Sequence, residues 1–499
     1  MILDVTYSLN DNWDVQSLFT HESTDVDRLF GLRENFSAFG GITFNQFDEE
    51  VSSAEIRFRF DYGGISGVFG GYLFESEADN RRDIQTLLGP QIAPAGGTVD
   101  PADAIISLFD GNVTDTQNFA FFSQLRWDID KHWTLDLGLR YDDEEFEDSA
   151  IFQSTSVIPE TCNATVPGAV VGAPVAQLTI PCQVLVDAVL GGTPQEPPQS
   201  ADYDAFLPKV ALTYNVSDDL SLFASYQRGY RAGGSFVFTA PADNALGNER
   251  IVGTYEPEYL TTFEIGLRSV SMDGAFVANL NVFHSRYDDQ QVRLPGADPT
   301  DSADDEIVNA AESTLYGLEA MFDYTINQQW SSYLSLGLLE TEFDKFPFAV
   351  TGPFSSLAGN ELPQAPDMSL SASVNWQGTS GWFGNLSFTY RSAQESDVDA
   401  LGEADFRRAF EDAGLSADLA DGLTEAVDAV NDLTGRFGYR SEQFEAYVYA
   451  TNILDDEAVT SVNYGGVNNG TGRIVLATSE TVSTVMPPRM VGIGFDYQF

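Results

Sequence analysis

The chain of 499 residues is poor in histidine, cysteine and basic side chains, and these shortages exclude several classes of function. Its three histidines, His21, His132 and His284, form no metal-binding or catalytic pattern. We therefore predict no catalytic residue, no metal site, no bound cofactor and no enzyme activity. Lys and Arg total 24 against 76 Asp and Glu, and the net charge of -52 predicts that the protein does not bind nucleic acid.

Long apolar runs are also missing. No stretch reaches the roughly 18 consecutive apolar residues of a membrane-spanning helix. Residues 1–20 lack the basic start and apolar core of a signal peptide. Hydrophobic residues still make up 43% of the chain, which excludes a disordered protein despite the charge. Hydropathy alone would favour a soluble protein, but transmembrane strands carry their signal in alternation, which an averaged hydropathy does not detect.

The chain is rich in such alternation. In the last segment, aromatic and aliphatic residues occupy one parity, and glycine or polar residues occupy the other. The apolar set is Val491, Ile493, Phe495, Tyr497 and Phe499, and the other set is Gly492, Gly494, Asp496 and Gln498. The same sorting recurs around residues 133–141, 263–268 and 316–324. Because successive strand residues point to opposite faces, each segment has one apolar face and one face of small or polar residues that contacts water.

This pattern predicts an all-β protein with about seventeen strands, many of them about 10 residues or longer, the span of a tilted transmembrane strand. The predicted strands are 2–9, 13–23, 51–61, 64–77, 118–129, 133–146, 205–216, 219–231, 258–270, 274–292, 313–325, 329–343, 367–377, 381–393, 432–440, 443–456 and 488–499. A β-sandwich also shows alternation, but its strands are typically about 5–6 residues long.

The connections between these strands fall into two classes that alternate along the chain. Short turns such as Asp218-Asp219, Met272-Asp273-Gly274, Asn327-Gln328-Gln329 and Gly378-Thr379-Ser380 suit hairpins. Long polar stretches, such as 147–204, 232–256 and 394–431, follow the strands at the other end. This asymmetry is typical of an antiparallel up-and-down barrel in the bacterial outer membrane, with periplasmic turns and extracellular loops.

Several blocks resemble the barrel of TonB-dependent outer-membrane receptors. They are Leu220 to Phe236 (LSLFASYQRGYRAGGSF), Tyr255 to Arg268 (YEPEYLTTFEIGLR), Thr314 to Asp323 (TLYGLEAMFD), Thr451 to Asp456 (TNILDD) and the terminal Phe499. The resemblance covers most of the chain, and its strength lies in the order of the blocks. It implies a 22-stranded barrel whose lumen holds an N-terminal plug. Residues 1–499 would then be one barrel domain that lacks the signal peptide, the plug and the first five strands.

The resemblance also implies partners and a location. These are the outer membrane of a Gram-negative bacterium and its lipid, the TonB energy-coupling complex acting through the plug, the barrel-assembly machinery, and an unidentified small-molecule ligand. We expect a monomer. The aromatic parity of Phe495, Tyr497 and Phe499 is the expected C-terminal insertion signal.

Charged residues also fall on the parity that points away from lipid. The lumen-facing candidates are Glu55, Arg57, Arg59, Asp136, Arg140, Lys209, Glu264, Arg268, Glu319 and Asp323. In a complete receptor they would face the plug, although simple hydration of a wide lumen explains them equally well.

The long polar stretches carry three further predictions. Cys162 and Cys182 are the only cysteines, and an oxidising compartment predicts a disulfide between them that stabilises by about 3 kcal/mol. Apolar residues at helical spacing predict two short amphipathic helices within 394–431, either packed on the barrel mouth or serving as a docking site. The acidic stretch from Asp298 to Glu306 lacks the EF-hand spacing, so we predict a solvated loop.

The resemblance implies an outer-membrane receptor for energised uptake of a scarce ligand, such as a ferric siderophore or a similar iron complex, haem, cobalamin or an oligosaccharide. Two alternatives stay open. One is a passive porin, which would need a constricting inward loop and no plug. The other is a secreted, acidic, all-β binding protein.

Overall fold

Seventeen strands form one large antiparallel sheet, in which each strand pairs with the next of the seventeen along the chain. The computed structural model describes residues 1–32, 41–87, 98–100, 105–157, 162–167, 177–182, 184, 198–241, 248–294, 306–346, 358–395, 426–464 and 481–497. The strands are β1 (Ile2–Asn10), β2 (Trp13–Leu32), β3 (Gly41–Asp61), β4 (Ile65–Leu87), β6 (Ile105–Asp128), β7 (Trp133–Val157), β10 (Gln199–Ser217), β11 (Leu220–Arg231), β14 (Glu258–Ser271), β15 (Phe276–Leu294), β16 (Glu306–Thr325), β17 (Trp330–Lys345), β18 (Met368–Gln377), β19 (Trp382–Arg391), β22 (Val430–Arg440), β23 (Phe444–Thr451) and β26 (Met490–Tyr497). All seventeen predicted strands are confirmed.

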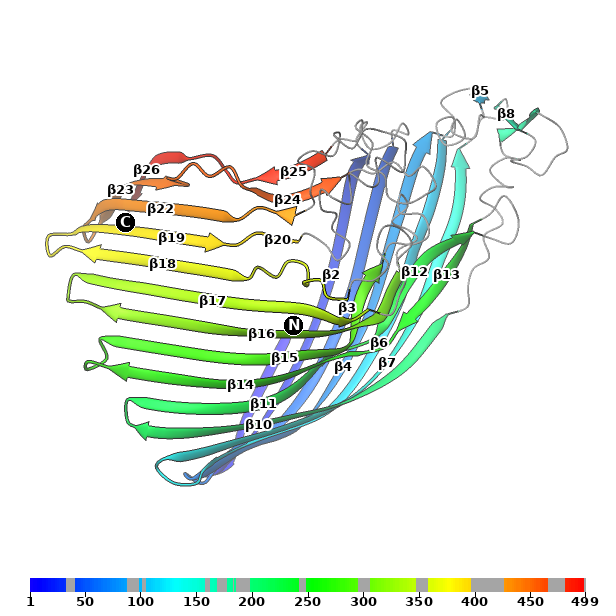
Figure 1. The fold of residues 1–499 in the computed structure, drawn as a ribbon. Coiled ribbons are helices and arrows are strands. Elements are labelled where there is room, and N and C mark those ends of the chain that lie inside the picture. Colours follow the sequence, from blue (N-terminus) through cyan, green and yellow to red (C-terminus); the bar gives the residue numbers. More distant parts are fainter. Residues whose placement is uncertain are drawn as a thin grey trace.

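The sheet is rolled into a curved wall (Figure 1). Short turns join the strands at one end, and the long connections and small extra strands gather at the other. In the part of the chain that is described, β1 pairs only with β2 and β26 pairs only with β23. These two strands are therefore the edges of the sheet.

The four short turns lie where the sequence predicts them. Asp218 and Asp219 separate β10 from β11, and the other three turns span the gaps before β15, β17 and β19. Met272 and Asp273 have φ values of 56° and 54°. Two successive residues with positive φ give the backbone twist that a tight hairpin between antiparallel strands requires.

Seven of the strands run much farther toward the long connections than the sequence predicts. β7 continues to Val157 and β10 starts at Gln199, so the connection predicted as 147–204 is shorter than expected. Pairing between these strands persists from Trp133 opposite Tyr214 up to Asp148 opposite Gln199. The alternation of apolar and polar residues stops near Asp142, because from there both faces carry polar side chains. Without an apolar face, periodicity no longer marks a strand.

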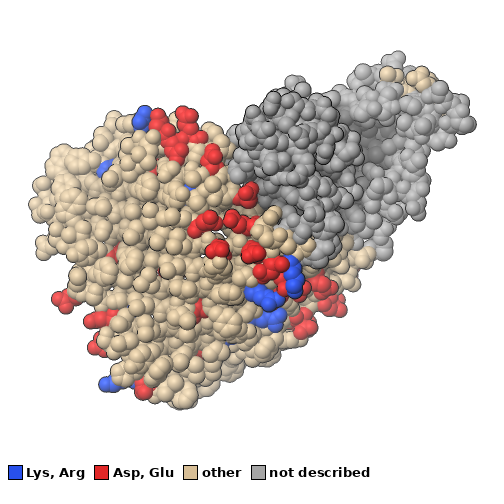
Figure 2. Space-filling view, in the orientation of Figure 1, with Lys and Arg blue, Asp and Glu red and all other residues tan. Residues whose placement is uncertain are grey.

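The outward face changes from apolar to acidic side chains near the level of Asp142. In β7 the outward Leu137, Leu139 and Tyr141 are exposed apolar side chains. Farther along the neighbouring strands, outward carboxylates stand directly opposite one another, with Glu50 across from Glu77, Glu77 across from Asp115, and Asp115 across from Glu147. Figure 2 shows the same division, since charged side chains gather toward the two ends of the strands and leave a wide surface between them nearly free of charge.

Among the described residues of the long connections lie nine further strands. They pair as β12 (Gly234–Pro241) with β13 (Asn248–Tyr255), β20 (Gln394–Glu395) with β21 (Ala426–Val427), β24 (Val459–Tyr464) with β25 (Thr481–Val485), and β5 (Thr98–Asp100), β8 (Asn163–Pro167) and β9 (Gln177–Pro181) in one small sheet. The residues described include no helix long and apolar enough to cross a membrane. The predicted helices within 394–431 and most of the acidic stretch 298–306 lie outside the described residues.

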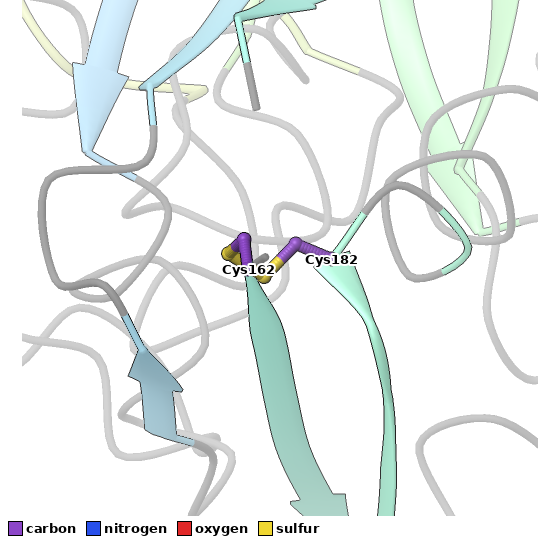
Figure 3. The surroundings of a disulfide bond; sticks show 2 residues. All are labelled: Cys162 and Cys182. Carbon is purple, nitrogen blue, oxygen red and sulfur yellow. A yellow bond between two sulfur atoms is a disulfide. The ribbon is translucent and has the colours of Figure 1, made fainter. Parts of the chain in front are cut away.

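A disulfide joins Cys162 and Cys182 beside the hairpin of β8 and β9 (Figure 3). Their Cα atoms are 5.4 Å apart, and the backbone N–H of Cys182 donates to the carbonyl of Cys162. Both side chains are buried. The covalent link and the hairpin hydrogen bonds therefore hold the same two chain segments together.

Candidate functional site

The face of the sheet opposite the apolar surface carries the charged residues that the sequence assigned to the lumen. Six of them line one hollow of about 1150 Å³ on β2, β3, β4, β6, β7 and β10. They are Glu55, Arg57, Arg59, Asp136, Arg140 and Lys209, and Arg126 lines the same hollow. The sequence analysis missed Arg126, although its parity in β6 marks it as inward. We call this hollow the charged wall.

Only some of the charged side chains in the charged wall form ion pairs. The Arg57 guanidinium pairs with Glu55, and Arg140 donates two hydrogen bonds to Asp142, the shorter at 2.6 Å. Arg59 donates to the amide oxygen of Gln16. Within the described ranges, neither Arg59 nor Lys209 has a carboxylate partner. The wall therefore presents two cationic groups that a carboxylate from outside the sheet could neutralise.

The opposite part of the inner face is mostly neutral. Arg268 and Glu319 line a second hollow of about 550 Å³ on β14 to β18, together with Asn279, Asn281, Ser335, Ser369 and Ser371. The guanidinium of Arg268 lies 4.8 Å from the ring centre of Phe223. Glu264 and Asp323 share the inward parity but line neither hollow. The structure thus divides the ten lumen candidates into two groups and two isolated residues.

The hairpin of β12 and β13, residues Gly234–Tyr255, is attached to the inner face at the end of the long connections. We call it the mouth hairpin. The hydroxyl of Ser235 donates to the buried carboxylate of Asp148 on β7, and Asn112 donates to the same carboxylate at 3.3 Å. Tyr203 of β10 donates to the carbonyl of Tyr255 at 2.8 Å. These contacts hold the hairpin against β7 and β10.

Two amide side chains hold the residues just before and just after the mouth hairpin from the other side. Gln291 donates to the carbonyls of Ala232 and Glu256, at 2.8 and 3.1 Å. Asn309 accepts from the backbone N–H of Glu256 and donates to its carbonyl, both at 2.7 Å. The connection is therefore held by strands on both sides. Gly233 permits this approach, since a Cβ there would lie 2.3 Å from the carbonyl oxygen of Tyr255.

Between the charged wall and the mouth hairpin lies a row of inward side chains on β7. Arg140 sits 5.6 Å from the ring centre of Tyr72, Asp142 is almost fully buried, and Glu144 accepts from Asn118 at 3.1 Å. Aromatic rings, a guanidinium and carboxylates facing one space can hold a small polar ligand or a ligand cation. The sequence analysis missed Asp142 and Glu144, because the strand was recognised by its apolar residues and these lie beyond them.

A second inward structure covers the end of β17. The segment 358–367 turns back onto the inner face, where Phe343 donates to the carbonyl of Asn360 and the backbone N–H of Leu362 donates to Thr341. An apolar cluster fixes it, formed by Val292, Ala311, Phe343, Phe346 and Leu362. Next to this segment, burial raises the pKa of the Glu395 carboxyl, and the nearby Glu361 raises it further.

This raised pKa predicts a pH effect. An acid whose pKa is higher in the folded state destabilises that state as pH rises from the ordinary glutamate range through the raised folded pKa. The backbone N–H of Gln364 donates to the Glu395 carbonyl. Glu395→Gln should therefore slow hydrogen exchange at this backbone amide at neutral pH and leave the exchange rate unchanged at low pH. Glu442→Gln, in the exposed turn before β23, is the control. Equal effects at both pH values would contradict the prediction.

A second prediction concerns Asp148. Asp148→Ala removes the acceptor of Ser235 and one of the two acceptors of Asn112, whose amide also donates to Thr114, at a cost of about 1–3 kcal/mol. We expect faster hydrogen exchange across the mouth hairpin, while β1 to β3 keep their protection. The control is Asp202→Ala, which removes an exposed, outward carboxylate from the paired strand. Equal exchange in both variants would show that Asp148 does not hold the hairpin.

Within the described residues, no three or more His, Cys, Asp or Glu side chains are grouped to hold a metal ion.

Comparisons with known proteins agree with this geometry. The family model "TonB dependent receptor-like, beta-barrel" matches residues 2–469. The ferric yersiniabactin uptake receptor FyuA from Yersinia pestis is similar in structure, with a TM-score of 0.64 and 15% identity over 100% of this chain. The siderophore receptor PiuA from Acinetobacter baumannii gives 0.61 and 13% over 99%. The chain spans 60% of the length of the first receptor and 63% of the second.

Proposed function

Because the chain belongs to the TonB-dependent receptor family through its β-barrel domain, we propose that it serves the energised uptake of a scarce small ligand across the outer membrane. The observation that carries the proposal is the family match over 2–469. The inward row of Tyr72, Arg140, Asp142 and Glu144 below the mouth hairpin supports it, because these side chains lie where a ligand entering between the long connections would meet them.

The ligand we propose is a ferric siderophore or a similar iron complex. FyuA and PiuA are described as receptors for such ligands. A third similar structure is described as the copper transporter OprC, with a TM-score of 0.50 and 11% identity over 100% of this chain and 70% of that one.

We further propose that residues 1–499 act as a monomeric barrel domain in the outer membrane of a Gram-negative bacterium. The charged wall, with Arg59 and Lys209, would face the plug through which the TonB complex acts. Phe495 and Tyr497 point outward on β26, and with Phe499 they would be read by the barrel-assembly machinery. Phe499 itself lies outside the described residues.

The family assignment favours this function over a passive porin or a secreted binding protein. The inward segment 358–367 is the feature that a porin would need, and this observation keeps the porin as the second candidate. An uptake measurement separates the two. Cells carrying the native gene should accumulate a radiolabelled ferric siderophore from a test panel, and cells without the gene should not. A protonophore should abolish the accumulation. Uptake that persists with the protonophore would favour the porin.

A further inference from the structure

The outward, apolar face of the sheet contains a groove of about 720 Å³ on β17 to β26. Its walls are Trp330, Val374, Trp376, Leu386, Phe437, Val448, Ile453 and Val491, and its floor contains Gly384, Gly435 and Ala450. Gly435 lies directly opposite both Leu386 and Ala450, and Gly384 lies opposite Trp376 and Phe437. The groove therefore exists because small residues sit side by side among large ones.

Neither the backbone conformation nor the packing of the described protein requires glycine at the two glycine positions of the floor. Gly384 and Gly435 are not among the glycines with positive φ. A Cβ at Gly384 would meet its nearest atom, on Phe437, at 3.4 Å, and a Cβ at Gly435 would meet Ile453 and Leu386 at 3.4 Å. These are ordinary contact distances. Glycine weakens a strand interior and often marks a place where another molecule approaches the backbone.

The inward glycines of β22 and β26 behave differently. A Cβ at Gly438 would lie 2.5 Å from the carbonyl oxygen of Ala446, and Cβ atoms at Gly492 and Gly494 would lie 2.5 and 2.2 Å from the rings of Tyr449 and Tyr447. Protein atoms already fill the space beside those three. Among the glycines of β19, β22 and β26, only the outward Gly384 and Gly435 leave space that the described chain does not fill.

We propose that the groove binds the hydrocarbon chain of a membrane phospholipid. The groove is continuous with the apolar outward surface and is lined almost wholly by apolar atoms, so its occupant must be apolar and must come from the bilayer. Trp330, Trp376, Trp382 and Phe437 form an aromatic shelf at its short-turn end, with ring centres 5.4 to 6.2 Å apart. Such rings sit at the level of lipid headgroups, which places the headgroup of the bound lipid there. The proposal rests on the membrane location and not on the transported ligand.

The first test is native mass spectrometry of the full chain, purified in detergent from cells carrying its gene and supplied with dipalmitoyl phosphatidylethanolamine. The wild type should retain the lipid through detergent exchange. The Gly384→Leu/Gly435→Leu double variant, which fills the floor, should lose it. The control is Ala224→Leu, which adds bulk at an exposed outward position on β11, away from the groove. Ligand uptake is measured in parallel, so that a failure of the proposed function is seen separately.

Three outcomes would overturn the proposal. The first is that the wild type retains no lipid, and the second is that the double variant retains as much lipid as the wild type. The third is that the wild type forms a dimer without bound lipid and that the double variant is monomeric, because the occupant of the groove would then be a second copy of the chain. Should the double variant not reach the membrane, tryptophan quenching tests the wild-type groove. The vesicles contain a small share of acyl-brominated phosphatidylcholine, which quenches the fluorescence of tryptophans that it contacts. Trp376→Phe should remove the part of the fluorescence that is quenched at the lowest share of brominated lipid. Trp133→Phe, on the distant strand β7, should not; equal changes would contradict the proposal.

Discussion

Leu137→Arg is expected to destabilise the folded barrel by about 2–4 kcal/mol, the cost of placing Arg on the lipid face near the middle of the membrane. Leu137 lies midway between the outward Trp133 and Tyr141 of β7 and is exposed on the apolar surface. The guanidinium would have to leave water for hydrocarbon with no acceptor nearby. Urea titration of the chain refolded into phosphatidylcholine vesicles measures the difference in free energy.

The matched control is Ala211→Arg on the neighbouring strand β10. Ala211 lies directly opposite Asp136 on the inner face, so an Arg there gains a carboxylate and keeps its water. Thr134 and Gly138 serve less well as controls. Thr134 is buried and donates to Asp128, and a Cβ at Gly138 would lie 3.2 Å from the Cβ of Lys209. If both Arg variants unfold at the same urea concentration, the two faces of the sheet have been assigned incorrectly.

Gly438→Ala is expected to destabilise the C-terminal strands by about 1–3 kcal/mol, the usual cost of overpacking. The added Cβ would lie 2.5 Å from the carbonyl oxygen of Ala446 and 2.6 Å from the Cβ of Tyr447. Neither atom can rotate away, because one is backbone and the other is fixed to it. Strands β22 and β23 must therefore separate. The same urea titration in vesicles gives the loss of stability.

Gly384→Ala is the control for this change, since it adds the same methyl group on the adjacent strand β19. Its nearest contact is 3.4 Å, so it should be neutral or slightly stabilising. A Gly438→Ala variant as stable as Gly384→Ala would show that the inner wall adjusts more easily than its packing indicates. The pair also separates glycines required by packing from those required by an external molecule.

The amino-acid sequence by itself determined the number of strands in the large sheet, the places of the short turns and the two faces. It could do so because each depends on neighbouring residues. Leu137 and Gly138 point to opposite sides in any strand, and a strand between hydrocarbon and water must alternate in polarity. The order of the blocks from Leu220 to Asp456 also identified the family that the model over residues 2–469 matches.

Only the tertiary structure decided how far the strands continue and which side chains come together. β7 runs on past Asp142 because it keeps its pairing with β6 and β10, and no local pattern records that pairing once both faces are wet. Ser235 meets Asp148, Arg59 shares a wall with Lys209, and Gly435 lies beside Ala450, through strand register and sheet curvature. These contacts join residues distant in the chain, so their positions depend on how all the strands pair, whereas alternation depends on each strand alone.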